Sequence, residues 1–397
     1  MAIASMGVPS LPPDYPMDIA FWVYVYIAAA VQAALLALAL WRRSANREAN
    51  RLLAVWVALT GLDLAVKAAY WHTLAPEWFR AYRFVALFPF LYGSLFFLYV
   101  RALTRGVGFR WRDLRHLLGF AAMLLVTGHV LLASTARLQA MSASWIAGER
   151  SIGHWFDIAL FVYSLSYVAA ALVRVHRYRQ RLRERRSDAD RLSLRWIDAM
   201  AACQVVIWCI AIVQALIYLP ILNYGLLFGA IAGWICVVGW FSLGQPPVAI
   251  EPEAAPADEA TAAPAASAEP DDARYDAVQA RLAALMDGAA PLYLEPALSI
   301  GQVAKRSGYP EYLVSAVINR RFGGTFWDYI NRLRVEAARA CLADAGDTRS
   351  ILDIAYACGF TSKSTFNAAF KRQVGDTPSA YRKARSLTAT AGRAGPG

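Results

Sequence analysis

The sequence predicts an all-α chain with seven membrane-spanning helices, a linker without a core, and a C-terminal helical domain built from a repeated unit. Of its 397 residues, 58% are hydrophobic, above the roughly 45–50% of an average globular chain. The apolar residues gather in long runs before Pro246, whereas residues 276–385 show helical spacing and no strand alternation. Hydrophobic patterning therefore separates a membrane half from a water-soluble half.

Each apolar run is long enough to cross a bilayer, which takes roughly 20 helical residues. The seven runs cover residues 17–41, 52–72, 82–104, 114–134, 153–175, 196–218 and 221–244. Residues 1–16 contain no Lys or Arg, so they lack the basic region of a cleavable signal peptide. We expect them to form an extracytoplasmic tail, and we expect the first run to act as the insertion signal.

Arginine is distributed unequally between the two sets of connections. Eighteen arginines follow the first, third and fifth spans, and four follow the second and fourth. Cytoplasmic loops are enriched in basic residues, so we expect the N-terminus outside and the chain after span seven inside. The arginines from Arg174 to Arg195 are interpreted as a topology signal that lies on anionic headgroups. A nucleic-acid-binding stripe is the alternative.

Ionisable residues within the spans are costly and often functional. Asp63 and Lys67 are four apart in span two and share a helix face. His154 and Asp157 lie at the outer end of span five. One hypothesis is a sensing pocket formed by these side chains. The alternative, which we favour, is that Asp63 and Lys67 neutralise each other while Asp157 lies in the hydrated interface.

Residues 245–274 form an acidic linker that is rich in Pro and Ala and has no basic residue before Arg274. Such a segment cannot bury a core and is expected to be disordered. A flexible coil cannot transmit a rotation of span seven, so the sequence favours transfer of a signal by proximity. Association of the membrane modules would then bring two C-terminal domains together, and proteolytic release is the alternative.

The C-terminal domain is an internal duplication. Residues 299–309 (SIGQVAKRSGY) align with residues 350–360 (SILDIAYACGF), and the similarity continues past this segment to Tyr329 and Tyr381. Between the two copies, residues 325–343 have the spacing of one long amphipathic helix. This helix would set the distance between the two copies.

Each copy predicts a helix-turn-helix unit. Gly308 and Gly359 end the first helix of each unit, where a left-handed residue is least costly in glycine. Pro310 opens the second helix of the first unit. Thr361 and Ser362 can cap the second helix of the other unit.

The second helix of each unit has an apolar face and a polar face. The apolar faces consist of Val314, Val317, Ile318, Phe366, Ala369 and Phe370. The polar faces include Tyr312, Ser315, Asn319, Arg320, Lys363, Ser364, Asn367 and Lys371. Such side chains contact base edges and phosphates in a major groove. The net charge of +5 over residues 276–385 suits phosphate binding; a helical bundle that binds a protein partner is the alternative.

The segments RLRVEAARACL and IAYACGFTSKSTFNAAFKRQVGDTPSAYRKA resemble the AraC/XylS-type transcription regulators, with their pattern GF-x-S-x-S-x-F followed by FK-x-x-x-G-x-TP-x-x-YR. The resemblance covers about 295–385, a quarter of the chain. It implies a seven-helix domain whose two units enter successive major grooves of DNA. The base-contacting positions that it implies are Tyr312, Ser315, Ala316, Lys363, Ser364, Asn367 and Ala368. We expect phosphate contacts from Asn319, Arg320, Arg321, Lys371, Arg372 and Arg382.

Seven spans stand in place of the sugar-binding β-barrel of many family members, as in membrane-bound forms of the family. The sequence thus favours a one-component sensor and regulator in a bacterial inner membrane, with a cytoplasmic DNA-binding domain at 275–385 and a disordered tail at 386–397. The expected partners are double-stranded DNA, the lipid bilayer, a second copy of the chain in a homodimer, and a small-molecule or envelope signal.

Other function classes receive less support. The sequence has no phosphate-cradling loop, paired carboxylates or nucleophile beside a base, and its five Cys and five His residues follow no metal-binding spacing. We therefore expect no catalytic residues, no metal and no cofactor. The alternatives that remain are a transporter, or a membrane scaffold, whose helical cytoplasmic tail binds a protein partner.

Overall fold

The structure, a computed structural model of the full chain, describes residues 19–146, 154–190, 192, 194–217, 225–243, 248, 272–288, 290–344 and 346–393. Apart from one isolated β-bridge, every regular element in these ranges is helical, which confirms the all-α prediction. The chain divides into two compact units. Unit one holds α1 to α9 except the end of α7, and unit two holds residues 176–194 with α10 to α16. The expected tail 1–16 and most of the linker 245–274 lie outside the described residues.

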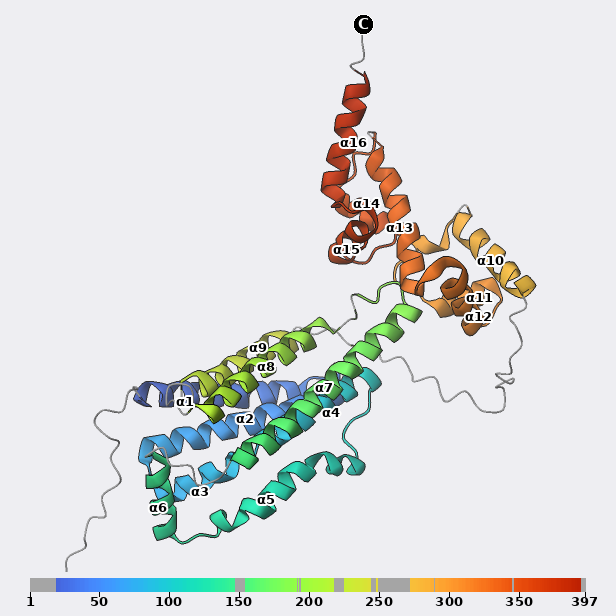
Figure 1. Cartoon of the computed structure of the whole chain (residues 1–397). Coiled ribbons are helices and arrows are strands. Elements are labelled where there is room, and N and C mark those ends of the chain that lie inside the picture. Colours follow the sequence, from blue (N-terminus) through green and yellow to red (C-terminus); the bar gives the residue numbers. More distant parts are fainter. Residues whose placement is uncertain are drawn as a thin grey trace, which may run out of the picture. The chain divides into compact units, whose positions relative to one another are not determined.

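Seven helical segments among the described residues are long and apolar enough to cross a membrane, and each one overlaps a predicted span (Figure 1). They are α1 (Ile19–Arg42), α2 (Arg47–Thr73), α3 (Pro76–Val85) with α4 (Pro89–Arg105), η1 (Trp111–Leu117) with α5 (Leu118–Leu131), α7 (His154–Arg185), α8 (Arg195–Leu216) and α9 (Phe228–Leu243). The third span breaks before Pro89 because proline has no N–H to continue the helix. A further helix, α6 (Thr135–Ile146), was not expected.

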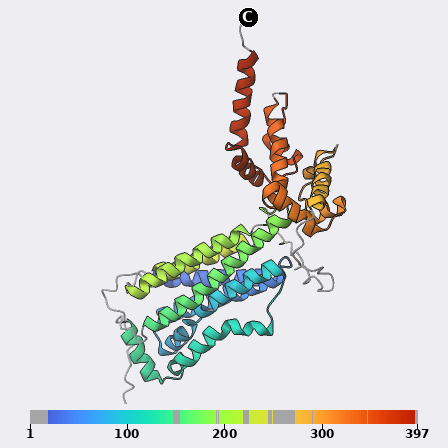
Figure 2. The same ribbon diagram turned by 45° about the vertical axis from the view of Figure 1, so that its right-hand side comes forward.

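Helix α2 lies at the centre of unit one, where it contacts α1, α3, α4 and α9. Figures 1 and 2 both show α1, α2, α4, α7, α8 and α9 running side by side. Two glycines allow close crossings: a Cβ at Gly61 would lie 2.7 Å from Cβ of Ala33, and one at Gly93 would lie 2.7 Å from the carbonyl oxygen of Ser164. Small residues let transmembrane backbones approach closely in this way.

The C-terminal part of unit two contains seven α-helices in its described residues, as the resemblance implied. They are α10 (Asp272–Asp287), α11 (Ile300–Ser307), α12 (Glu311–Val317), α13 (Phe326–Ala343), α14 (Ile351–Ala357), α15 (Lys363–Val374) and α16 (Pro378–Arg393). The two predicted helix-turn-helix units are α11 with α12 and α14 with α15. Figure 1 shows α13 running from the first helix-turn-helix unit to the second.

The turns of both helix-turn-helix units have the predicted conformation. Gly308 and Gly359 adopt left-handed backbone angles, with φ of +79° and +85°. At Gly359 a Cβ would also lie 2.7 Å from the carbonyl oxygen of Leu294, so this position requires glycine for space as well as for conformation. The Ser362 hydroxyl accepts a hydrogen bond of 3.1 Å from the Thr365 N–H and caps α15.

Two hydrophobic cores meet on α13. The first core joins α10, α11 and α12 to Ile330, and the second joins α14 and α15 to Val335. Phe366 and Phe370 are fully buried in the second core, as the helix phase predicted. The amphipathic pattern of α13 therefore contributes core residues to both helix-turn-helix units.

The helical ends differ from the expected domain limits of 275 and 385. Helix α10 already begins at Asp272, and α16 continues to Arg393. Acidic residues at a helix N-terminus are favourable, which suits the start at Asp272. The segment after 385 contains no proline and no glycine before Gly392, so nothing in it interrupts α16 within the expected tail.

Replacement of Phe370 by alanine should unfold, or nearly unfold, the C-terminal domain. The Phe370 ring contacts the rings of Phe366 and Tyr381, each with centroids 5.6 Å apart. Truncation of a buried phenylalanine costs about 3–5 kcal/mol, a large share of the stability of a small domain. Urea denaturation of residues 272–397 would measure this loss, with the exposed Asn367→Ala as the control. A urea midpoint close to that of the wild type would contradict the assigned helix phase.

Candidate DNA interface and membrane cavity

Helix α15 exposes the polar side chains that were expected to contact bases. Lys363, Ser364, Asn367 and Ala368 are all exposed, whereas Phe366 on the other side is buried. Lys363 makes no ion pair with any residue that the structure describes. This face of α15 is therefore available to a ligand that brings hydrogen-bonding groups and negative charge.

Helix α12 exposes a smaller surface. Tyr312 is 67% exposed, whereas Ser315 and Ala316 are half-buried. The helix ends at Val317, and the chain continues as a π-helical turn, Ile318–Gly323. The arrangement leaves Tyr312 as the most accessible of the three expected base contacts in this unit.

The six expected phosphate contacts fall into two groups. Asn319 and Lys371 are exposed, and their side chains make no hydrogen bond or ion pair within the described part of the chain. Four arginines are engaged in the domain: Arg321 with Asp272 and Asp276, Arg320 over the ring of Tyr275, Arg372 with Asp328, and Arg382 with the carbonyl oxygen of Arg349. Apart from the half-buried Arg382, these side chains are exposed, where an ion pair is worth at most about 1 kcal/mol.

Arg334 is a structural residue that the sequence did not reveal. It lies in the middle of α13 and is 1% exposed. Its Nε and Nη2 each donate a hydrogen bond of 2.7 Å, to the carbonyl oxygens of Tyr293 and Glu295, and its guanidinium lies 5.8 Å from the ring centroid of Phe360. Burial lowers the pKa of Arg334 to about 10. One side chain thus ties the loop after α10 to α13 and to the second core.

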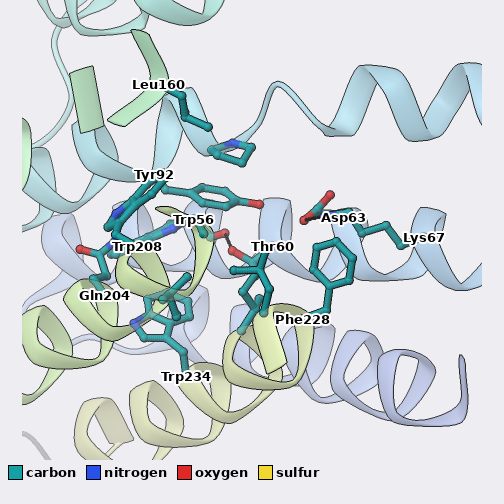
Figure 3. Close-up of a pocket in the computed structure, with 15 residues that line it drawn as sticks. Trp56, Thr60, Asp63, Lys67, Tyr92, Leu160, Gln204, Trp208, Phe228 and Trp234 are labelled. Atoms are coloured by element: carbon teal, nitrogen blue, oxygen red, sulfur yellow. Dashed lines mark hydrogen bonds and ion pairs between the residues drawn. The ribbon is translucent and has the colours of Figure 1, made fainter. Parts of the chain in front are cut away.

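Unit one contains a cavity of about 130 Å³ among α2, α4, α7, α8 and α9 (Figure 3). Its walls are mainly aromatic and aliphatic, and they include Trp56, Tyr92, Leu160, Trp208, Phe228 and Trp234. At its edge Lys67 Nζ lies 2.6 Å from Asp63 Oδ2 and 4.0 Å from the centroid of the Phe228 ring. The lysine charge is therefore balanced by one carboxylate oxygen and one aromatic face.

Several polar atoms of the cavity wall have no partner among the described residues. These atoms are Asp63 Oδ1, Tyr92 OH, Gln204 Oε1 and Trp234 Nε1, and all four residues are buried. Figure 3 shows the phenol of Tyr92 pointing toward the Asp63 carboxylate. Buried polar groups are normally hydrogen-bonded, so this wall offers two acceptors, one N–H donor and the Tyr92 hydroxyl to a molecule in the cavity.

The cavity contains only part of the set suggested by the sequence. Asp63 and Lys67 form the expected ion pair and line the cavity. Asp157 does not line it, and the side chain of His154 lies outside the described part of the structure. Gln204 and the tryptophans come from spans six, two and seven, and no local spacing connects them with Asp63.

Comparison with known proteins identifies the C-terminal domain. A family described as "Helix-turn-helix domain" matches residues 303–384. Regulatory protein SoxS of Escherichia coli K12 is 36% identical over 90 residues, which cover 23% of this chain and 82% of SoxS. The chain belongs to the AraC/XylS family. It is a DNA-binding transcription regulator and not an enzyme.

Two longer relatives match over stretches of similar length. The melibiose operon regulatory protein of Escherichia coli K12 is 36% identical over 89 residues, 22% of this chain and 29% of that protein. The right origin-binding protein of the same strain is 32% identical over 97 residues, 24% of this chain and 33% of that protein. No solved structure matches the chain. The AraC/XylS-type domain is therefore the shared part, and the seven apolar spans lie outside it.

Replacement of Arg334 by lysine should destabilise the AraC/XylS-type domain by about 1–3 kcal/mol. A lysine ammonium cannot reproduce the fixed fork of a guanidinium, so one of the two carbonyl oxygens would remain buried without a donor. Urea denaturation would measure the effect. Arg339→Lys on the exposed side of α13 is the matched control and should leave the midpoint unchanged. Equal midpoints for the two variants would show that the Arg334 hydrogen bonds add nothing to stability.

Proposed function

We propose that this protein is a membrane-anchored, sequence-specific transcription regulator in which the seven-helix module receives the signal. The observation that carries the proposal is that a single chain contains an AraC/XylS-type domain and seven helices long enough to span a bilayer. The exposed polar face of α15 supports recognition of DNA in the major groove. The length and apolar character of the spans support anchoring at the membrane.

The orientation that suits this function has the N-terminus outside and the AraC/XylS-type domain in the cytoplasm. Arginine is concentrated after spans one, three and five, and basic loops remain on the cytoplasmic side. With seven spans, the C-terminal domain then lies on the side where DNA is found.

Alanine at Lys363 or Asn367 should weaken binding to the cognate promoter by about 1–3 kcal/mol and relax base preference. Both side chains are exposed on α15 next to its buried core face. Binding of the full chain in lipid nanodiscs to promoter DNA and to random DNA would be compared by gel retardation. Equal losses on the two DNAs would show that this face of α15 does not contact bases.

Alanine at Lys371 should instead weaken binding to every sequence, because a phosphate contact carries no base preference. Removal of one phosphate contact should lower the slope of log affinity against log salt by about 1. Lys371 suits this test because it is exposed and has no ion-pair partner in the described residues. An unchanged salt slope would place the α15 C-terminus away from the DNA backbone.

The input site that we propose is the cavity of unit one. Its size, about 130 Å³, is close to that of a cavity of about 150 Å³ that binds benzene. The aromatic walls favour an apolar or cationic body, and the free acceptors on Asp63 and Gln204 require a donor. A small aromatic molecule with a hydroxyl or ammonium group meets these requirements, whereas a carboxylate has no donor for the free acceptors.

Titration with 2-phenylethylamine and 3-phenylpropanol should change the tryptophan fluorescence of the full chain in nanodiscs, because Trp56, Trp208 and Trp234 line the cavity. Benzoate should have no effect. Gln204→Leu should weaken binding about fivefold, the value of one net hydrogen bond of about 1 kcal/mol. Asp157→Asn is the control, since Asp157 does not line the cavity. The same affinity in Gln204→Leu as in the wild type would contradict this assignment.

A further inference from the structure

Residues 176–194 comprise the last ten residues of α7 and the chain that leads to α8, and they belong to the compact unit that contains the AraC/XylS-type domain. Helix α7 has 32 residues, which corresponds to a length of about 48 Å. The hydrocarbon core of a bilayer is only about 30 Å thick. Helix α7 is therefore longer than a bilayer core requires, and its last ten residues belong to unit two.

The backbone of this connection pairs with the backbone of the domain. Arg186 and Ser299 form an antiparallel β-bridge, and the Ser187 N–H donates a hydrogen bond of 3.0 Å to the carbonyl oxygen of Leu298. Ser187 is also held through its carbonyl oxygen, which accepts a hydrogen bond of 3.2 Å from Asn331 Nδ2. Ser187 and Asn331 are both fully buried, so these bonds are protected from water.

Apolar side chains fill the rest of the contact. Leu182 of α7 and Ala189 of the following turn pack with Trp327 at the start of α13, and all three are buried. Tyr178 and Leu192 pack against the same cluster. Without residues 176–194, the indole of Trp327 would lose these neighbours.

A buried charge lies beside the same contact. Asp188 is 5% exposed, and it accepts hydrogen bonds of 2.8 and 3.2 Å from the Arg186 side chain. Its negative charge also partly offsets the effect of burial on the pKa of Arg334. The connection therefore complements the domain in charge as well as in shape.

Trp327 also links this contact to the DNA-facing helix. The guanidinium of Arg183 lies 5.4 Å from the centroid of the Trp327 ring, and the guanidinium of Arg372 in α15 lies 4.3 Å from it. Arg372 is further held by Asp328, with Nη2 and Oδ1 3.4 Å apart. Arg372, which was expected to contact a phosphate, thus already contacts Trp327, and Trp327 is the residue against which the end of α7 packs.

We propose that residues 176–194 are an intramolecular docking element, which holds the AraC/XylS-type domain at Trp327 in a state of low DNA affinity and releases it when the membrane module changes state. The docking follows from the contacts described above, and its regulatory consequence rests on the proposed function. In the docked state the Arg372 guanidinium is engaged by Trp327 and Asp328, and these contacts compete with a phosphate for it. If only a fraction of the chains is undocked, the apparent affinity for DNA falls by that fraction.

Docking can be measured without DNA by a disulfide across the β-bridge. Residues that face each other in an antiparallel pair have Cα atoms about 4.5–5.5 Å apart, within the range that a disulfide accepts. The variant Arg186→Cys/Ser299→Cys would be made in a full-length chain with its five native cysteines replaced by alanine and a protease site inserted between residues 250 and 270. After oxidation in membranes and cleavage, the two fragments should remain joined until a reductant is added.

The pair Gln180→Cys/Ser299→Cys is the control, because Gln180 is exposed on α7 and has no bridge to Ser299. We expect at least tenfold more joined fragments for the bridge pair than for this control. Equal yields would overturn the docking proposal.

Undocking is best tested from the α7 side, so that the AraC/XylS-type domain keeps its own sequence. Leu182→Glu places a carboxylate in the cluster around Trp327, while Gln180→Glu places the same side chain on the exposed side of the same helix. In the bridge-pair background, Leu182→Glu should lower the disulfide yield at least fivefold and Gln180→Glu should not. Equal yields for the two variants would show that the cluster does not hold the domain.

The regulatory part is tested by DNA affinity. Full-length Leu182→Glu in nanodiscs should bind promoter DNA at least fivefold more tightly than Gln180→Glu. Equal affinities, with the disulfide yields as expected, would overturn the claim that docking limits DNA binding. If neither variant binds DNA, the proposed function fails, and the disulfide yields still decide whether the segment docks.

Discussion

The C-terminal domain depends on the burial of α13 from two sides. Helices α11, α12 and α14 have only seven or eight residues each, fewer than the roughly 12–15 that an isolated helix needs in water. They persist because Ile330 and Val335 anchor one core on each side of α13. Arg334, between these two residues, satisfies the carbonyl oxygens of the loop that precedes α11. The second helices of both helix-turn-helix units, α12 and α15, therefore take their position from one helix that contributes few exposed residues of its own.

The membrane module is subject to a different constraint, because lipid satisfies no polar group. Asp63 and Lys67 are tolerated in the interior of α2 since each neutralises the other at 2.6 Å. A buried pair of this kind adds little stability, but loss of one partner leaves an uncompensated charge. The pair uses only one carboxylate oxygen, and the other oxygen faces a cavity lined by aromatic rings. The Asp63–Lys67 pair adds little stability and lies beside buried polar atoms that have no partner among the described residues. Binding of a ligand explains this arrangement better than stability does.

Two routes connect the membrane module to the AraC/XylS-type domain. One is the linker before α10, which is acidic and rich in Pro and Ala, and which suits transfer of a signal by proximity. The other is α7, whose extension contacts Trp327. The arginine-rich connection also contributes Leu182 and Ala189 to the cluster around Trp327. Its role as a topology signal remains a prediction, and that role is compatible with this packing.

The sequence by itself determined the helical class, the seven spans, the two helix-turn-helix units and the phase of their recognition helices. These features depend on local periodicity and on residues such as Gly308, Gly359 and Ser362, whose conformational preferences act within one turn. Only the tertiary structure decided the roles of Arg334 and Trp327, the partners of Asp63 in the cavity, and the docking of residues 176–194. Asn331 and Ser187, for example, are 144 positions apart. A contact over such a separation leaves no periodic trace in the sequence, because it is selected by the shape and polarity of a surface that exists only after the chain has folded.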